Sequence, residues 1–203
     1  MELEERKKLL KSIRKCIKDT EYPAKSLAVA DNFLGSNDCF NCYGYLFGFT
    51  GTEYIRIYKR GLWNLGYLCD TSFRFESKRE AEEILKSDFE ILKLKLVNSS
   101  EAEKLIFGDL KFAMYYSDYD FHFVRQNADG TWSHKVGWES YPESLRVGED
   151  GKLEDVLRNK PDYELVGIYK VNMREGEEEF NEEIENIEDN KTQSLNKNIS
   201  ISR

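Results

Sequence analysis

The chain has 203 residues, 33 % of them charged, and 38 acidic against 30 basic side chains give it a formal net charge of −8. This length suffices for one domain with a sizeable core and is too short for two full domains. The acidic balance argues against a broad basic surface, so we expect no nucleic-acid partner.

The N-terminal segment MELEERKKLLKSIRKC is charged throughout and lacks the apolar core of a signal peptide. No stretch approaches the roughly 18 apolar residues that a membrane-spanning helix needs. These features predict a cytoplasmic protein without a membrane partner.

Residues 2–18 have the spacing of an amphipathic helix. Its apolar positions at helical intervals are Leu9, Leu10, Ile13, Cys16 and Ile17. Residues 19–37 contain Pro23 and Gly35, so this stretch is interpreted as a connector that runs over the surface.

The four cysteines are Cys16, Cys39, Cys42 and Cys69, and in a cytoplasmic chain they do not indicate disulfides. Cys39 and Cys42 have CxxC spacing, which fits a zinc half-site, a redox pair or one reactive thiol. No second CxxC completes a zinc site. We therefore expect no metal and no cofactor, with zinc at this pair as the alternative.

Cys42 is the main candidate for a reactive thiol. The polar residues 36–38 precede the apolar, aromatic stretch 39–49, and this pattern predicts the start of a buried helix. A cysteine in the first turn would direct its sulfur at free backbone N–H groups and the positive end of the helix dipole, which lowers a thiol pKa. Cys39 is the second choice, and a small buried apolar residue is the alternative interpretation of Cys42.

The middle of the chain mixes both kinds of secondary structure. The pattern predicts a helix over residues 77–87 and strands over residues 54–58, 89–97 and 110–116. The glycine-broken stretch 61–68 is interpreted as a loop or a wall lined by Trp63.

Both histidines of the chain lie within residues 119–137. Alternating residues around His122 predict a strand, residues 127–130 (Asn-Ala-Asp-Gly) form a turn, and residues 131–134 begin a second strand. His122 and His134 are twelve positions apart, so the hairpin brings them to the same end of a two-stranded ribbon. Whether they share a face depends on the register. Two such imidazoles act together on a third group, or are simply two exposed residues.

Residues 137–153 contain Pro142 and Gly148 and are interpreted as a loop, and residues 162–171 predict a final strand able to pair with the hairpin. Beyond Arg174 the sequence becomes strongly acidic and then polar. We therefore predict one α+β domain over residues 1–174 and an acidic, disordered or loosely helical tail over residues 175–203.

The order of these residues resembles that of NlpC-type papain-like cysteine peptidases. In that family a cysteine begins a helix, a first histidine opens a strand, a glycine-containing turn follows, and a second histidine on the next strand orients the first. The matching segments are NCYGY at 41–45, HFVR at 122–125 and GTWSH at 130–134. Over about residues 37–171 the chain is also similar to a group of bacterial and phage proteins with an NCYxY-like segment and a DYHxxRQxxDGxWSHKxG-like hairpin. The resemblance implies a papain-like core, with N-terminal helices packed on an antiparallel sheet.

The resemblance also implies a role for each matching residue. Cys42 would be the nucleophile, His122 the general base, and His134 the group that fixes the tautomer of His122. The backbone N–H of Cys42 and the side chain of Asn41 would meet the oxyanion. If His134 pairs with the thiol instead, His122 becomes the orienting partner, with Asp118 or Asp120 as a further candidate. The substrate-groove candidates are Tyr43, Trp63, Arg125, Trp132 and Trp138, with hairpin packing as the alternative for Arg125 and the last two tryptophans.

These patterns support two functions. The first is a thiol-dependent hydrolase or acyl-transfer enzyme, a peptidase or amidase, acting on a peptide or protein. The second is a catalytically inactive papain-like scaffold that binds a protein partner through the acidic tail or an aromatic surface, as a phage or host-conflict factor.

Overall fold

The computed structural model describes residues 10–15, 17–18, 22–23, 41–47, 65–66, 68–69, 75–118, 120–136, 142–145, 153 and 162–182. The strand predicted over residues 54–58 lies outside the described residues. So do Cys16, Cys39, Trp63 and Trp138 and, with them, the predictions made for their side chains.

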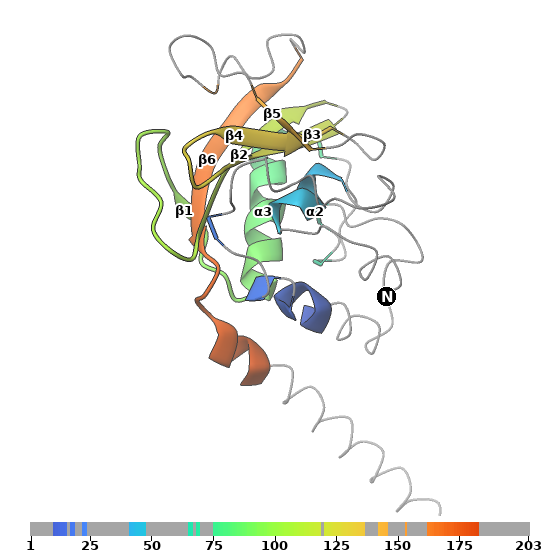
Figure 1. Ribbon diagram of the computed structural model, residues 1–203. Helices are drawn as coiled ribbons and strands as arrows, with labels where there is room; N and C mark the ends of the chain where they lie inside the picture. The colour runs from blue at the N-terminus through green and yellow to red at the C-terminus, as the bar shows by residue number, and fades with distance from the viewer. Residues whose placement is uncertain are drawn as a thin grey trace, which may run out of the picture.

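An antiparallel sheet forms the body of the described chain (Figure 1), with six strands in the order β1-β6-β2-β3-β4-β5. Each neighbouring pair of strands is antiparallel. The strands are β1 (Val97–Asn98), β2 (Asp109–Ser117), β3 (Asp120–Gln126), β4 (Trp132–Lys135), β5 (Pro142–Ser144) and β6 (Glu164–Asn172). This mixture of helices and an antiparallel sheet confirms the predicted α+β class.

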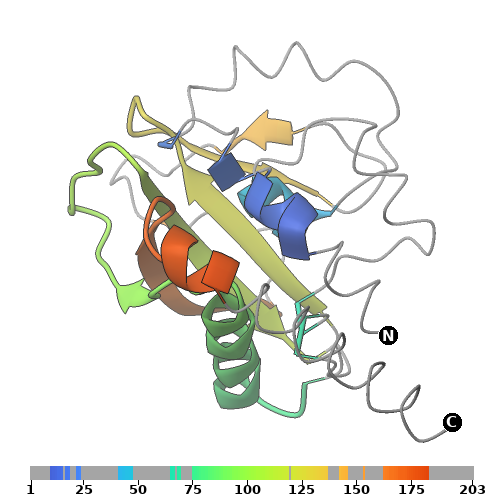
Figure 2. The same ribbon diagram turned by 90° about the horizontal axis from the view of Figure 1, so that it is seen from below.

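Helices lie along one side of the sheet, as Figures 1 and 2 show from two directions. They are α2 (Cys42–Leu46), α3 (Lys78–Ile91) and an N-terminal helical segment that comprises residues 10–15 and 17–18. The side chain of Ser77 caps α3 by accepting the backbone N–H of Glu80 at 3.2 Å. The helix predicted over residues 77–87 is therefore confirmed, and it continues to Ile91.

The alternation of β2 divides the apolar side chains between two clusters, because successive residues of a strand point to opposite faces. Phe112 and Met114 belong to the larger cluster, which also contains buried residues of the helices. Ala113 and Tyr115 belong to a smaller cluster with Val124, Trp132 and Leu153. All nine residues of β2 are buried, so this strand is covered on both faces.

The predicted strand over residues 89–97 is wrong for most of its length. Phe89 lies inside α3 and is fully buried, with its ring stacked on Phe112 at 5.6 Å between centroids. It follows Leu85 by four positions and so continues the apolar face of the helix. Only the end of this stretch is a strand, where residue 97 begins the two-residue strand β1.

Two other predictions differ from the structure in detail. Residues 162–171 do form a strand, β6, but β6 pairs with β1 and β2 rather than with the hairpin. Residues 142–144, interpreted as loop, form the outer strand β5. An edge strand tolerates Pro142 because its outer side needs no donor for the ladder.

The packed body extends past the predicted boundary at residue 174. Residues 177–182 form a helical turn in which Phe180 is 3 % exposed. Lys18 of the N-terminal helical segment pairs with Glu177 at 2.8 Å. The acidic composition of this stretch therefore did not prevent residues 177–182 from packing on the domain.

The helices found in the described part of the chain are all too short or too polar to cross a bilayer.

Replacement of Phe89 by Ala tests the core between α3 and the sheet. We expect a loss of about 3–5 kcal/mol in the free energy of unfolding, because a buried phenylalanine is replaced by a cavity. Phe107, which is 72 % exposed, is the matched control. Phe107→Ala should change stability by about 0.5 kcal/mol or less. Urea denaturation followed by circular dichroism measures both, and equal losses would contradict the packing described.

Candidate functional site

The helix α2 begins at Cys42 because Asn41 caps it. The Asn41 side-chain oxygen accepts the backbone N–H groups of Tyr43 at 3.0 Å and Gly44 at 3.1 Å. This confirms that Cys42 stands in the first turn of a buried helix. The capping residue is Asn41, whose side-chain oxygen is engaged by the helix backbone.

The Cys42 thiol is buried and surrounded by backbone donors. The backbone N–H groups of Phe123, Tyr43 and Cys42 favour the thiolate and lower its pKa. Burial acts in the opposite direction more strongly and, with a contribution from the negative charge of Asp120, raises the pKa of Cys42 to about 12. The predicted lowering of this pKa is wrong, because the desolvation of a sulfur in a residue that is 5 % exposed outweighs the helix N-terminus.

The two histidines share a face of the hairpin and contact each other. β3 pairs with β4 so that Val124 faces His134, which places His122 two residues away on the same side. His122 Nε2 and His134 Nδ1 are 2.7 Å apart, and the rings meet edge to face. The hairpin prediction is thus confirmed, and the register settles the question of the shared face.

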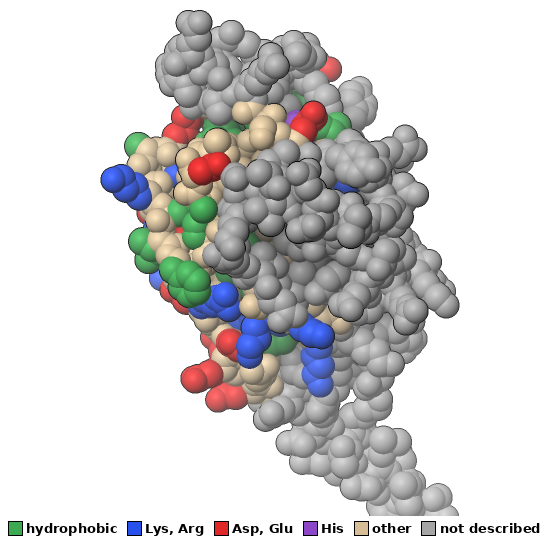
Figure 3. Space-filling model, viewed as in Figure 1, with side chains coloured by type: hydrophobic (Ala, Val, Ile, Leu, Met, Phe, Trp, Pro, Cys, Tyr) green, Lys and Arg blue, Asp and Glu red, His purple; other side chains and the backbone are tan. Residues whose placement is uncertain are grey.

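Glu143 extends this pair. It faces His134 across the β4–β5 ladder, and its Oε1 lies 3.2 Å from His134 Nε2. His122, His134 and Glu143 therefore form a continuous row across three strands. Figure 3 shows a small histidine surface beside acidic side chains near the top of the described face, so the row reaches the molecular surface.

The thiol lies against the residues that flank His122. The backbone of Phe123, the next residue, lowers the pKa of the thiol, and Asp120, two residues before His122, raises it. Tyr163 donates to Asp120 at 2.6 Å, stands 6.5 Å from the His122 ring between centroids, and has a pKa raised by burial, by Asp120 and by Cys42. Three residues close to His122 in the chain or in the fold, namely Phe123, Asp120 and Tyr163, therefore interact electrostatically with Cys42.

A buried polar network fixes α2 against the sheet. The Tyr45 hydroxyl is 2.8 Å from Ser133 Oγ. Arg125 donates to the carbonyl of Tyr45 at 2.9 Å and stacks on its ring at 3.8 Å. On the other side, the Tyr43 hydroxyl donates to Asp88 of α3 at 3.0 Å. The helix that carries Cys42 is therefore held by polar contacts from two directions.

The substrate-groove candidates that the structure describes are buried. Tyr43 and Arg125 are buried in the contacts of α2, and Trp132 is buried in the smaller cluster. A hairpin tryptophan or arginine is equally suited to packing and to a groove, and pattern alone did not separate the two. The remaining candidates, Trp63 and Trp138, lie outside the described residues.

Glu143 and Tyr163 were not identified from the sequence. Glu143 follows Pro142 in a stretch without alternation, so no signal indicated that it would pair with His134. Tyr163 precedes β6 and approaches His122 through the tertiary fold.

Within the described ranges no cluster of three or more His, Cys, Asp or Glu side chains is arranged to hold a metal ion. The zinc alternative depends on Cys39, outside those ranges.

Comparisons with protein-family models, with curated proteins and with solved structures find no match for this chain.

The raised thiol pKa predicts a loss of stability at alkaline pH. In the unfolded chain Cys42 ionises near 9.0, whereas the folded thiol holds its proton to about 12. Between these values the unfolded state loses its proton first, so folding stability falls as the pH rises. Cys42→Ala should lose less stability than the wild type from about pH 9 to about pH 11, by about 2–3 kcal/mol. Urea denaturation at both pH values gives the free energy of unfolding of each protein. An equal loss between these pH values in the wild type and in Cys42→Ala would contradict the prediction.

Proposed function

We propose that the protein is a thiol-dependent hydrolase or acyl-transfer enzyme of peptidase or amidase type, with Cys42 as nucleophile. The observation that carries the proposal is the 2.7 Å contact between His122 and His134, together with a thiol whose pKa responds to Phe123 and Asp120 on the same strand as His122. The antiparallel sheet, with a cysteine at the start of a helix packed on it, is also consistent with a papain-like core of the NlpC type.

We infer the proton positions of both rings from this row of side chains. A Glu143 carboxylate accepts from His134 Nε2–H, which leaves a lone pair on Nδ1 of a neutral His134. That lone pair accepts the Nε2–H of His122. The remaining nitrogen of His122, Nδ1, then carries a lone pair and is the base that we assign to the thiol.

This arrangement suits a thiol that rests in its neutral form. As the Cys42 sulfur bonds to a substrate acyl carbon, His122 Nδ1 takes the thiol proton. The protonated ring returns that proton to the leaving amine when the carbon–nitrogen bond breaks. Water, or another acceptor, then releases the acyl group from sulfur. The backbone N–H of Cys42 is the oxyanion donor in this scheme.

Acylation by an activated ester tests the nucleophile and the base. With p-nitrophenyl acetate, the wild type should gain one acetyl group on the peptide that contains Cys42, as measured by mass spectrometry. Cys42→Ala should abolish this product, and His122→Ala should slow it by about 10²–10⁴-fold. Cys69→Ala, which removes the other described free cysteine, should leave the rate unchanged. Unchanged acylation in His122→Ala would exclude His122 as the base.

Glu143→Gln tests the outer end of the row. We expect acylation to slow by about two- to fivefold, because an exposed ion pair contributes only about 0.2–1 kcal/mol. Glu143 is 62 % exposed, so its replacement should not disturb folding. Glu90→Gln on the exposed face of α3 makes the same charge change away from the site and should have no effect. An equal effect of both variants would remove Glu143 from the mechanism.

A second candidate is the catalytically inactive scaffold that binds a protein partner. It is favoured by the burial of Cys42 and by the alternation of β3, which directs the side chains of His122 and Phe123 to opposite faces. If the folded wild type gains no acetyl group on Cys42 while the urea-unfolded chain does, the thiol is a packing residue and this candidate replaces the first.

A further inference from the structure

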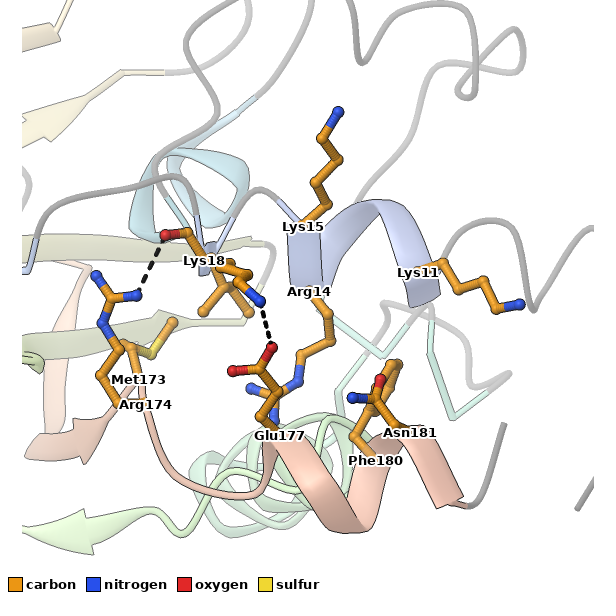
Figure 4. Close-up of a pocket in the computed structure, with 10 residues that line it drawn as sticks. Lys11, Arg14, Lys15, Lys18, Met173, Arg174, Glu177, Phe180 and Asn181 are labelled. Atoms are coloured by element: carbon orange, nitrogen blue, oxygen red, sulfur yellow. Dashed lines mark hydrogen bonds and ion pairs between the residues drawn. The ribbon is translucent and has the colours of Figure 1, made fainter. Parts of the chain in front are cut away.

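A second site lies away from the histidines, where the two ends of the described chain meet. A cavity of about 170 Å³ is bounded by the N-terminal helical segment and by residues near the helical turn 177–182 (Figure 4). Ile17, Met173 and Phe180 give it a buried apolar floor. The cavity contains none of the residues assigned to thiol chemistry, so a ligand bound there is independent of the proposed function.

The lining of this cavity is strongly basic. Four of its cations follow one face of the N-terminal helical segment at positions i, i+3, i+4 and i+7, namely Lys11, Arg14, Lys15 and Lys18. Arg174 adds a fifth, whereas Glu177 is the single carboxylate among the lining residues that the structure describes. Figure 3 shows Lys and Arg side chains gathered at the lower edge of the described surface. This local positive charge contrasts with the net charge of −8 for the whole chain.

Glu177 is shared among several of these cations, since Lys18, Arg14 and Arg174 all lower the pKa of its carboxyl group. It is already engaged by Lys18, whose Nζ lies 2.8 Å from its Oε1. Arg174 uses Nη1 to donate to the backbone carbonyl of Lys18 at 3.2 Å, which adds no negative charge. Like charges four positions apart on a helix repel each other. A nearby anion would therefore reduce the repulsion within two pairs of cations, Lys11 with Lys15 and Arg14 with Lys18.

Among the lining residues, Arg14 is the one whose buried, charged side chain a bound anion would stabilise most. Its Nη2 donates to the Glu175 carbonyl at 3.0 Å, and its guanidinium covers the Phe180 ring at 5.1 Å. Its Nε is buried and has no hydrogen-bond partner among the described residues. Burial lowers the pKa of Arg14, an effect that Glu177 opposes only in part. An oxyanion in the cavity would accept from this side chain and offset its desolvation.

We propose that this basic cavity binds the phosphate group of a small molecule or of a lipid headgroup. Phosphate suits the lining because an arginine fork and surrounding lysine point charges are its usual ligands in proteins. The cavity has room for one such group, and the apolar floor provides a surface for the organic part attached to it.

Isothermal titration with inorganic pyrophosphate tests the site. We expect saturable binding to the full chain that weakens as salt is added. The double variant Lys11→Gln with Lys15→Gln should bind about tenfold more weakly, because two attractive charges are lost. Lys11 and Lys15 are exposed on the helix surface, so the fold should be retained. The matched control is Lys95→Gln with Lys104→Gln, two exposed lysines outside the cavity.

The outcomes separate the two sources of phosphate. Sedimentation with phosphatidylcholine vesicles that contain phosphatidic acid, displaced by pyrophosphate, would assign the site to a lipid headgroup. Pyrophosphate binding without vesicle binding would assign it to a soluble phosphate compound. Absence of saturable pyrophosphate binding, or equal weakening in the cavity variant and the control, would overturn the proposal.

Discussion

The position of α2, and with it the candidate site, depends on the buried carboxylate of Asp88. This group accepts the Tyr43 hydroxyl and the backbone N–H groups of Gly66 at 2.8 Å and Cys69 at 3.2 Å. Burial raises the pKa of Asp88, while these three donors oppose the shift. A buried carboxylate is costly unless it is hydrogen-bonded, so its donors must be present together. Asp88 thereby joins α3, α2 and the turns at residues 65–66 and 68–69 into one unit.

The local sequence pattern was sufficient to predict the elements that are stabilised by residues near one another in the chain. The turn at residues 127–130 and the alternation around it were sufficient for the β3–β4 hairpin, and Ser77 with the apolar spacing after it was sufficient for the start of α3. The residues after Ser87 carry an ambiguous pattern, since Phe89 fits both a helix face and an alternating strand. The core around Phe112 decided in favour of the helix.

The candidate site was predictable only as far as the hairpin reaches. A spacing of twelve positions placed His122 and His134 on paired arms, but Glu143 enters through a β4–β5 register that nothing in its own segment specifies. The thiol environment was misjudged for a related reason. The first-turn position of Cys42 is a local property, whereas the desolvation that dominates its pKa comes from the whole fold.

The outer position of β5 also bears on how the molecule meets other copies of itself. An exposed sheet edge offers unpaired backbone groups to which a foreign strand can add, and this is a common route to aggregation. β5 is three residues long and begins with Pro142, whose nitrogen carries no hydrogen. The opposite edge, β1, has two residues. Both outermost strands of the described sheet are short, so β5 and β1 themselves offer few backbone groups for such strand addition.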